Sequence, residues 1–392
     1  MKKKFNFISI AIFIFFLTTE FLKAEEIQYP KTIQMNPFQL KVENILTLKT
    51  KEEILTRTAS LQINDINDEK LFRIFLQNGF ILNNNELIQM SLPKTFYLEE
   101  MGGVKSVFTI DKNDFALISN KKENCIFFSL LNLTLTKVLL QTECLPDDKG
   151  IDLNGIGGAV IFFDENIYLS IGAPENQSEK IRDLAQSKSS IFGKILKISK
   201  EDLLNSKEQA LKYSIFSYGH RNPQGLVEIN KRIFSTEHGP MGGDEINLIQ
   251  YNKNYGWPLK SYGVRYIFKK GDTGKSFKYD KKIDDYQGPI YSFVPSVATS
   301  ALSECPNNLN NYYPNNICLL FLTLRAKSLF IVLINEENLS VQNIQKIFIG
   351  ERMRNFAVNS KIRTFFDNNS FFVSADGKGA AKILKLTFLN FR

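Results

Sequence analysis

The feature that most constrains the fold is a recurring pattern of an apolar segment, a short polar turn and a second apolar segment. It occurs as VFTIDKNDFALIS from Val107, AVIFFDENIYLSIG from Ala159, GLVEINKRIFSTEHG from Gly225 and IRTFFDNNSFFVSADG from Ile362. The spacings between successive turn anchors are 53, 66 and 137 residues, for Asp111, Asp164, Asn230 and Asp367. The last spacing is close to twice the one before it, and repeats of this length with short strands are typical of a β-propeller.

A β-sandwich also alternates strands and turns, but the chain is long for a single sandwich. About six blades would account for the roughly 370 residues that follow the N-terminal leader. The stretch up to about Pro93 matches the repeat poorly, although FILNNNELIQM near Phe80 is compatible with the outer part of a blade. The clearest helix candidate runs from Glu201 to Leu211, with Ser199 as its N-cap.

Residues 1–24 are typical of a secretory signal peptide. Three lysines open the chain, an apolar run extends from Phe5 to Leu17, and Ala24 precedes two glutamates. The apolar run is short for a membrane span, and Glu20 and Lys23 follow it closely, which disfavours a permanent anchor. We therefore expect residues 25–392 to form one propeller domain in a periplasmic or secreted protein.

Four cysteines are consistent with export into oxidising conditions. Their positions suggest two local pairs, Cys125 with Cys144 and Cys305 with Cys318, among the three pairings that four cysteines allow. Buried thiols are the alternative.

Removing the leader, with its four lysines and one glutamate, lowers the formal net charge from +8 to +5. This mild charge, without a basic helix, disfavours nucleic-acid binding but leaves open a basic cavity for a small polyanion.

Polar residues that are suited to a functional site concentrate between Ser217 and Pro258. Over these residues the chain reads SYGHRNPQGL, STEHGP, GGDEINLI and NYGWP. Hard cations such as Ca²⁺ need carboxylates and carbonyl groups that tight turns hold in place. Solvated turns between strands are the alternative interpretation. We favour a site that includes bound calcium.

The combination of GHRNPQGL, TEHGP and GGDEINLI resembles the soluble glucose, sorbosone and aldose sugar dehydrogenases that depend on pyrroloquinoline quinone (PQQ). The resemblance is strongest over Gly157 to Tyr266 and is traceable from about Glu99 to the C-terminus. It implies a six-bladed β-propeller with PQQ on top, the cofactor's carboxylates held by basic residues. It also implies a calcium ion that polarises the quinone and a histidine that takes the sugar hydroxyl proton during hydride transfer.

Carried over residue by residue, the resemblance implies cofactor contacts at Arg221, Asn222, Ser296, Arg325, Arg352 and Arg354. It further implies that the carbonyls of Gly239 and Pro240 ligate the cofactor's calcium, and that Glu245 and Tyr255 ligate a second, structural calcium. Arg325 stands where the family has a lysine, which keeps the charge but changes the geometry. Fork-shaped guanidinium groups suit a tricarboxylate such as PQQ.

Two departures affect the catalytic end of the site. Counting back from Asn166 puts Asn154 at the family's proton-acceptor position, and Met101 stands where the family has a glutamine. An amide does not accept a proton near neutral pH. The only two histidines, His220 and His238, already belong to the HRN and EHGP motifs. Loss of a positioned general base costs on the order of a hundred- to ten-thousand-fold in rate.

We therefore expect an exported PQQ- and calcium-dependent dehydrogenase-like protein whose catalysis is impaired at Asn154. By resemblance, its substrate is an aldose or related polyol and its electrons pass to a periplasmic acceptor. Asp152 is a substitute proton acceptor if it is not simply a solvated loop carboxylate. The alternative is a non-catalytic, calcium-stabilised propeller that binds a glycan, polyanion or protein. A third possibility, a calcium-dependent hydrolase, would need Asp244 or Glu245 as its base.

Overall fold

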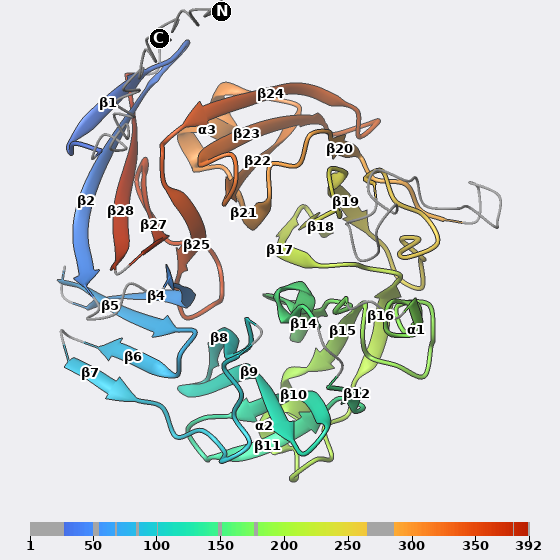
Figure 1. Cartoon of the computed structure of the whole chain (residues 1–392). Helices are drawn as coiled ribbons and strands as arrows, with labels where there is room; N and C mark the ends of the chain where they lie inside the picture. Colours follow the sequence, from blue (N-terminus) through green and yellow to red (C-terminus); the bar gives the residue numbers. More distant parts are fainter. Residues whose placement is uncertain are drawn as a thin grey trace, which may run out of the picture.

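The computed structural model describes residues 27–49, 55–66, 69–83, 86–99, 101–147, 151–175, 179–264, 286–378 and 380–390. Its regular structure is almost entirely β, in sheets arranged as a ring (Figure 1). This confirms the predicted β-propeller architecture. The predicted leader, residues 1–24, lies outside the described residues. Within the described ranges, no helix is both long and apolar enough to span a membrane.

Three sheets contain four strands each, and strands that are consecutive in the chain pair antiparallel within them. One is formed by β13 (Gly157–Phe163), β14 (Asn166–Ile171), β15 (Lys194–Ser199) and β16 (Ser214–Tyr218). The next is formed by β17 (Pro223–Ile229), β18 (Arg232–Glu237), β19 (Asp244–Ile249) and β20 (Tyr291–Phe293). The third is formed by β21 (Thr299–Glu304), β22 (Asn316–Thr323), β23 (Ser328–Asn335) and β24 (Val341–Phe348).

A fourth sheet has five strands, and a fifth, larger sheet joins the two ends of the chain. The five-stranded sheet contains β8 (Val104–Ile110), β9 (Asn113–Lys122), β10 (Cys125–Asn132), β11 (Lys137–Gln141) and β12 (Leu145–Pro146). The N-terminal strands of the large sheet are β1 (Lys31–Gln34), β2 (Gln39–Lys49), β3 (Leu55–Thr56), β4 (Thr58–Ile66), β5 (Glu69–Leu76), β6 (Phe80–Asn83) and β7 (Glu86–Gln89). Its C-terminal strands are β25 (Arg352–Val358), β26 (Phe366–Asp367), β27 (Ser370–Lys378) and β28 (Ala380–Leu389).

Two contacts within the large sheet close the ring. Strand β2 pairs antiparallel with β28, from Gln39 opposite Leu389 to Lys49 opposite Ala380. Strand β25 pairs with β4 in a short parallel contact at Ala357 and Leu61. The strands β4, β8, β13, β17, β21 and β25 contact one another in this order around the middle of the ring (Figure 1). A closed ring of this kind leaves only short, protected sheet edges.

The apolar core lies between neighbouring sheets. Alternating side chains of β8–β10 and β13–β15 form one cluster, in which Phe128 meets Phe192 edge-on with ring centroids 6.1 Å apart. A second cluster lies between β21–β23 and the C-terminal strands β25, β27 and β28, and includes Phe356, Phe371 and Phe388. These clusters fix the angle between sheets, and so position the loops that carry the polar residues.

The turns that anchor the sequence repeat are tight two-residue hairpins. In three of them both central residues have positive φ: Asp111 and Lys112 (45° and 66°), Asp164 and Glu165 (50° and 55°), Asn230 and Lys231 (51° and 61°). Such turns match the right-handed twist of paired strands, and Asp and Asn tolerate this conformation better than most residues. The fourth turn, between β26 and β27, has Asn368 at a φ of 54°. The repeat prediction therefore identified real hairpins.

The stretch near Phe80 forms the hairpin of β6 and β7, on the far side of β5 from β4. Every residue of β7 is exposed, as an outermost strand would be. The poor match of the N-terminal stretch to the repeat has a structural reason. Its first strands, β1 and β2, complete the sheet of the C-terminal strands, whereas β4–β7 continue from β25.

The predicted helix is shorter than expected. Helix α2 (Lys200–Asn205) begins after Ser199, whose hydroxyl accepts a hydrogen bond from the Asp202 amide, so the predicted N-cap is confirmed. The predicted end at Leu211 is wrong. The amides of Gln209 and Leu211 donate to the carbonyls of Val138 and Leu139 in β11, which draws the chain away from the helix. The other short helices are α1 (Glu179–Asp183), α3 (Asn307–Tyr312) and the 3₁₀ turn η1 (Leu153–Ile156).

Both suggested disulfides are present, Cys125–Cys144 and Cys305–Cys318, and no described cysteine is left unpaired. The second pair is buried in the cluster between β22 and the C-terminal strands, where Cys305 is 1% and Cys318 2% exposed. It joins the end of β21 to β22 across α3. The bridge therefore closes the loop that contains α3 between these two strands.

Replacing Cys305 and Cys318 together by alanine is expected to lower the free energy of unfolding by about 3 kcal/mol, because the crosslink restricts the unfolded chain. Urea denaturation followed by fluorescence measures this loss. The loops closed by the two bridges differ little, with separations of 13 and 19 residues. Because loop entropy changes slowly with length, Cys125→Ala/Cys144→Ala should lose a similar amount. Unchanged midpoints in both variants would contradict this expectation.

Candidate functional site

A cavity of about 260 Å³ opens where loops of several sheets meet at one end of the ring. Five residues that the sequence predicted for the site line this cavity: Asn154, Arg221, Asn222, Arg352 and Arg354. They come from η1, from the loop before β17, and from β25. The structure therefore brings together residues that are up to 200 positions apart in the chain.

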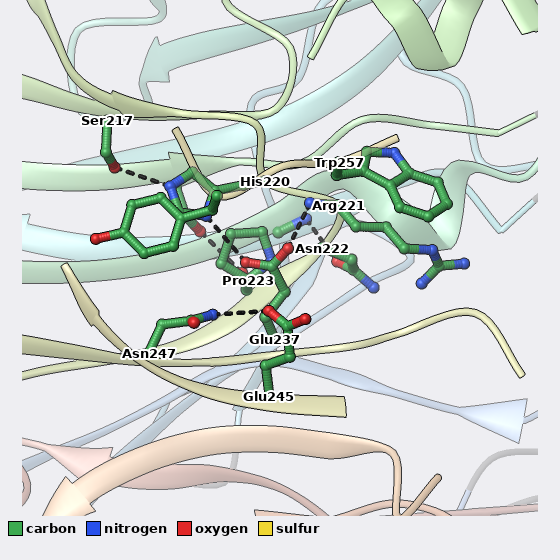
Figure 2. Close-up of polar contacts among 12 residues, drawn as sticks. Ser217, His220, Arg221, Asn222, Pro223, Glu237, Glu245, Asn247 and Trp257 are labelled. Carbon is green, nitrogen blue, oxygen red and sulfur yellow. Dashed lines mark hydrogen bonds and ion pairs between the residues drawn. The ribbon is translucent and has the colours of Figure 1, made fainter. Parts of the chain in front are cut away.

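Arg221 is held by contacts on three sides. Its Nε donates to Glu175 Oε1 at 2.5 Å, and its Nη1 donates to the carbonyls of His238 (3.1 Å) and Gly239 (2.9 Å). The guanidinium also lies 5.3 Å from the centre of the Trp257 ring, within the range of a cation–π contact. Figure 2 shows Arg221 extended beneath Trp257. These contacts fix the cation at the wall of the cavity.

His220 has a structural role in the same loop. Its imidazole is fully buried, with Nδ1 2.9 Å from Glu237 Oε2 and Nε2 2.8 Å from Ser217 Oγ (Figure 2). Since a carboxylate only accepts hydrogen bonds, Nδ1 carries the proton that faces Glu237. The Tyr255 ring stacks on the imidazole, with centroids 4.5 Å apart. Both ring nitrogens of His220 are therefore occupied by structural contacts, as expected.

His238 differs from that expectation. It lines the cavity, and its Nε2 is buried without a hydrogen-bond partner among the described residues. Burial lowers the pKa of His238; nearby Asp244 opposes this shift and Arg221 adds to it. The EHGP motif therefore engages the backbone of this residue, and its ring also makes a hydrogen bond to the Thr299 backbone, which leaves Nε2 available to a ligand.

Asp244 organises the cavity wall from behind. Its fully buried carboxylate accepts hydrogen bonds from the amides of Gly239 (3.0 Å), Val297 (2.9 Å) and Ala298 (2.6 Å), and from the Ser296 hydroxyl (2.8 Å). It thus joins the turn after β18 to the segment before β21. Ser296 does not line the cavity, because its hydroxyl is turned toward Asp244, whereas Ala298 does. The sequence analysis placed a cofactor contact at Ser296, and the residue of this segment that lines the cavity is Ala298, two positions later.

Arg352 and Arg354 extend from the start of β25. Arg354 Nε donates to the buried Asp376 carboxylate at 2.6 Å. Arg352 Nε is buried and has no hydrogen-bond partner in the described part of the chain. Burial lowers the pKa of Arg352, and the positive charge of Arg354 adds to this shift. A buried guanidinium nitrogen without a partner is costly, so the Nε of Arg352 marks a position where an anionic group would be bound favourably.

Arg325 does not join these residues. Its side chain is exposed, and its neighbour Leu324 lines the cavity instead.

Asn154, by contrast, lies at the cavity with Asp152. The Asn154 amide nitrogen of the backbone donates to Asp152 Oδ1 (2.9 Å), and its side-chain Oδ1 accepts from Arg57 Nη1 (2.9 Å). Both Asp152 and Asn154 are accessible from solvent.

Three of the predicted calcium ligands line a small adjoining cavity of about 10 Å³: Gly239, Glu245 and Tyr255. Pro240 is buried next to Gly239. Burial raises the pKa of Glu245 to about 8, and the nearby Glu237 carboxylate adds to this. The Glu237 and Glu245 carboxylates with a carbonyl suit a hard divalent cation, although Lys260 also lines this cavity and Glu237 already accepts from His220 and the Arg221 amide. Among the described residues, no group of three or more His, Cys, Asp or Glu side chains is placed to hold a metal.

Two cations of the site were missed by the sequence analysis, Arg57 and Lys105. Arg57 lines the main cavity, and Lys105 lines a smaller one beside it. Arg57 precedes β4, in the stretch that matches the repeat poorly. Lys105 stands four positions after Met101, in MGGVKSV. A cation at the start of an inner strand was the sequence signal that could have identified it as a site residue.

In this β-propeller, four arginines line one polar cavity: Arg57, Arg221, Arg352 and Arg354. The chain belongs to the glucose/sorbosone dehydrogenase family, whose model matches residues 131–370. This is the family of soluble PQQ-dependent sugar dehydrogenases, as the resemblance predicted.

Curated relatives match parts of the chain. It is 33% identical over 157 residues to the aldose sugar dehydrogenase YliI of Escherichia coli, covering 38% of this chain and 40% of that protein. It is 34% identical over 152 residues to an uncharacterized protein of Synechocystis, covering 36% of each. The matched region thus spans well under half of the length of these relatives.

Two solved structures are similar over most of the chain. The soluble aldose sugar dehydrogenase of Escherichia coli in its apo-form has a TM-score of 0.64 at 19% identity, covering 89% of this chain and 99% of that one. The PQQ-bound aldose sugar dehydrogenase of Streptomyces coelicolor has a TM-score of 0.57 at 18% identity, covering 89% and 98%. At these identities the likeness shows the fold, which agrees with the predicted propeller.

Proposed function

We propose that this protein is an exported, PQQ- and calcium-dependent aldose dehydrogenase-like protein whose catalysis is impaired. The observation that carries the proposal is the buried, unpartnered Nε of Arg352, in a cavity that Arg221 and Arg354 also line. With Arg57, four guanidinium groups line this polar cavity, and together they suit a ligand with several carboxylates. Family membership makes PQQ the fitting choice.

Arg221, Asn222, Arg352 and Arg354 would hold PQQ, and the Gly239 and Pro240 carbonyls would hold its calcium. Arg325 would reach the cofactor only from outside the cavity lining. When bound, PQQ supplies an ortho-quinone that accepts hydride from a sugar. Glu245 and Tyr255 would belong to a second, structural calcium site, where a divalent cation offsets the repulsion between Glu245 and Glu237.

The chain's own residues orient the ligands more than they move protons. Asp244 holds the turn at Gly239 against the wall at Ala298, which keeps the cavity in shape before a ligand arrives. Arg221 is fixed by Glu175 and Trp257, so little ordering cost is left for binding. Asn154 accepts a hydrogen bond from Arg57 but takes no proton near neutral pH. The sugar hydroxyl therefore lacks the positioned base of the family, which makes turnover slow.

Titration of the purified mature protein with PQQ in calcium tests this proposal. Calorimetry and quinone absorbance report binding, and a panel of aldoses with an artificial electron acceptor reports turnover. Micromolar or tighter binding with slow turnover is the expected result. Absence of PQQ binding at micromolar concentrations would overturn the proposal. A chelator control that abolishes binding would support calcium as part of the site.

The second candidate function is a non-catalytic propeller that binds a glycan, polyanion or protein. Asn154 at the proton-acceptor position favours it, because a binding module needs no base. PQQ binding without any turnover on the aldose panel would decide for a cofactor-holding protein of this kind. For a hydrolase, Asp244 is disfavoured as the base, because it is fully engaged by four hydrogen bonds.

Six blades and export are part of the same proposal. The ring order of β4, β8, β13, β17, β21 and β25 supports six blades, with the large sheet made of two blades joined through the β25–β4 contact. Two disulfides support an oxidising compartment such as the periplasm. Electrons from the sugar would then pass to a periplasmic acceptor.

A further inference from the structure

A second polar cavity of about 70 Å³ adjoins the main one. We call it the basic annex, after the three cations that line it: Arg57, Lys105 and Arg354. No described carboxylate lines it, and the rest of its polar lining is neutral: Thr58, Gln77, Asn154, Gln224 and Asn355. Arg57, Asn154, Gln224 and Arg354 line both cavities, so the two are continuous.

The cations of the annex are incompletely balanced. Lys105 Nζ donates to the Met101 carbonyl, and Arg57 Nη1 donates to Asn154 Oδ1, so both are hydrogen-bonded to neutral groups. Arg354 alone forms an ion pair, with Asp376. The other nearby carboxylate, Asp152, faces the main cavity and accepts from the Asn154 backbone. Three cations therefore face two carboxylates, and neither carboxylate lies inside the annex.

This crowding has an electrostatic consequence. Burial, and then the charges of Arg57 and Arg354, lower the pKa of Lys105 to about 7, although Asp152 opposes the shift. Burial and Arg354 likewise lower the pKa of Arg57 to about 10, while Asp376 and Asp152 oppose this. An anion placed among these groups would relieve the repulsion and restore their charge.

The annex lies at the sugar end of the site. Arg57 contacts Asn154, which stands at the family's proton-acceptor position, so the annex borders the place where a sugar hydroxyl would react. We propose that the basic annex binds an anionic group of the substrate, so that the preferred ligand is an acidic monosaccharide, a uronate or a sugar phosphate. This inference rests on the proposed function for the orientation of the sugar. Fork-shaped Arg57 and the Lys105 ammonium suit either anion.

Calorimetric binding to the PQQ-free and PQQ-loaded protein tests the inference, with glucuronate, glucose 6-phosphate, glucose and inorganic phosphate as probes. Glucuronate or glucose 6-phosphate should bind about tenfold or more tightly than glucose, since charge-assisted hydrogen bonds replace neutral ones. Inorganic phosphate should compete with the acidic sugar that binds. Equal binding of glucose and both acidic sugars would overturn the inference.

The variants Arg57→Gln and Lys105→Gln should each remove most of this preference. Arg363→Gln is the matched control, because Arg363 pairs with Glu228 by a different cavity, and it should keep the preference. Glucuronate binding should weaken between pH 6 and 8.5 as Lys105 loses its proton, and Lys105→Gln should flatten this profile. An equal loss in Arg363→Gln, or an unchanged profile in Lys105→Gln, would contradict the assignment.

Two outcomes separate this inference from the proposed function. If PQQ does not bind but glucuronate does, the proposed function fails and the annex stands. If PQQ binds and expels glucuronate competitively, the annex belongs to the cofactor and the inference fails. Simultaneous binding of PQQ and glucuronate supports both.

Discussion

An Asp244→Ala variant is expected to lose about 3–5 kcal/mol of unfolding free energy, the range found when one partner of a buried charged interaction is removed. The carboxylate is fully buried and accepts from three backbone amides and the Ser296 hydroxyl. Alanine would leave these donors without an acceptor in a place that water does not reach. Urea denaturation measures the loss, and PQQ titration of the folded fraction should show weaker binding because the cavity wall is no longer held.

Two further variants serve as comparisons for Asp244→Ala. Asp244→Asn keeps the shape and one acceptor oxygen but turns an amide donor toward the remaining donors, so its loss should be large but smaller than that of alanine. Glu208→Ala, at an exposed position after α2, should change stability by no more than about 0.5 kcal/mol. If Asp244→Ala were as stable as Glu208→Ala, the carboxylate would not hold the two segments together.

The hairpins were predictable because their determinants are local. Asp111, Asp164 and Asn230 each stand at a turn position that needs positive φ, and the apolar strands on either side follow directly in sequence. The same holds for the Ser199 N-cap, which needs only the amide of Asp202 three residues later. Where two or three neighbouring residues decide the conformation, a sequence pattern is sufficient.

Long-range pairing was not predictable in the same way. Strand β2 completes the sheet of β28, across more than 300 residues, and nothing local to either strand specifies the other. The prediction of where the helix ends was wrong for a related reason, since the amides of Gln209 and Leu211 donate hydrogen bonds to a different sheet. The site shows the same division. Arg221 and Asn222 lie in a recognisable motif, whereas Arg57 and Asn154 are 97 positions apart in the chain and meet only because neighbouring sheets pack side by side.

The variant Asn154→His is expected to raise the turnover of aldoses by the PQQ-loaded protein on the order of a hundred- to ten-thousand-fold, the range that a positioned general base supplies. Asn154 lies on the cavity lining, accessible from solvent. The adjacent Arg57 cation would favour the neutral form of an imidazole here, and that is the form that accepts a proton. Steady-state kinetics with an artificial electron acceptor measures the change, which should fall on kcat more than on KM.

The matched control is Asn154→Gln, which keeps an amide and adds length without a titratable group. It should leave turnover low, and PQQ affinity should stay close to that of the parent protein in both variants, because Arg352 and Arg354, which would hold the cofactor, are unchanged. A rise in Asn154→His that grows with pH as the imidazole deprotonates would identify it as the base. If Asn154→His stayed as slow as Asn154→Gln while binding PQQ normally, position 154 would not face the reacting hydroxyl. The slow step would then lie in sugar placement, and in that case the cations beside Asn154 would be the residues to change next.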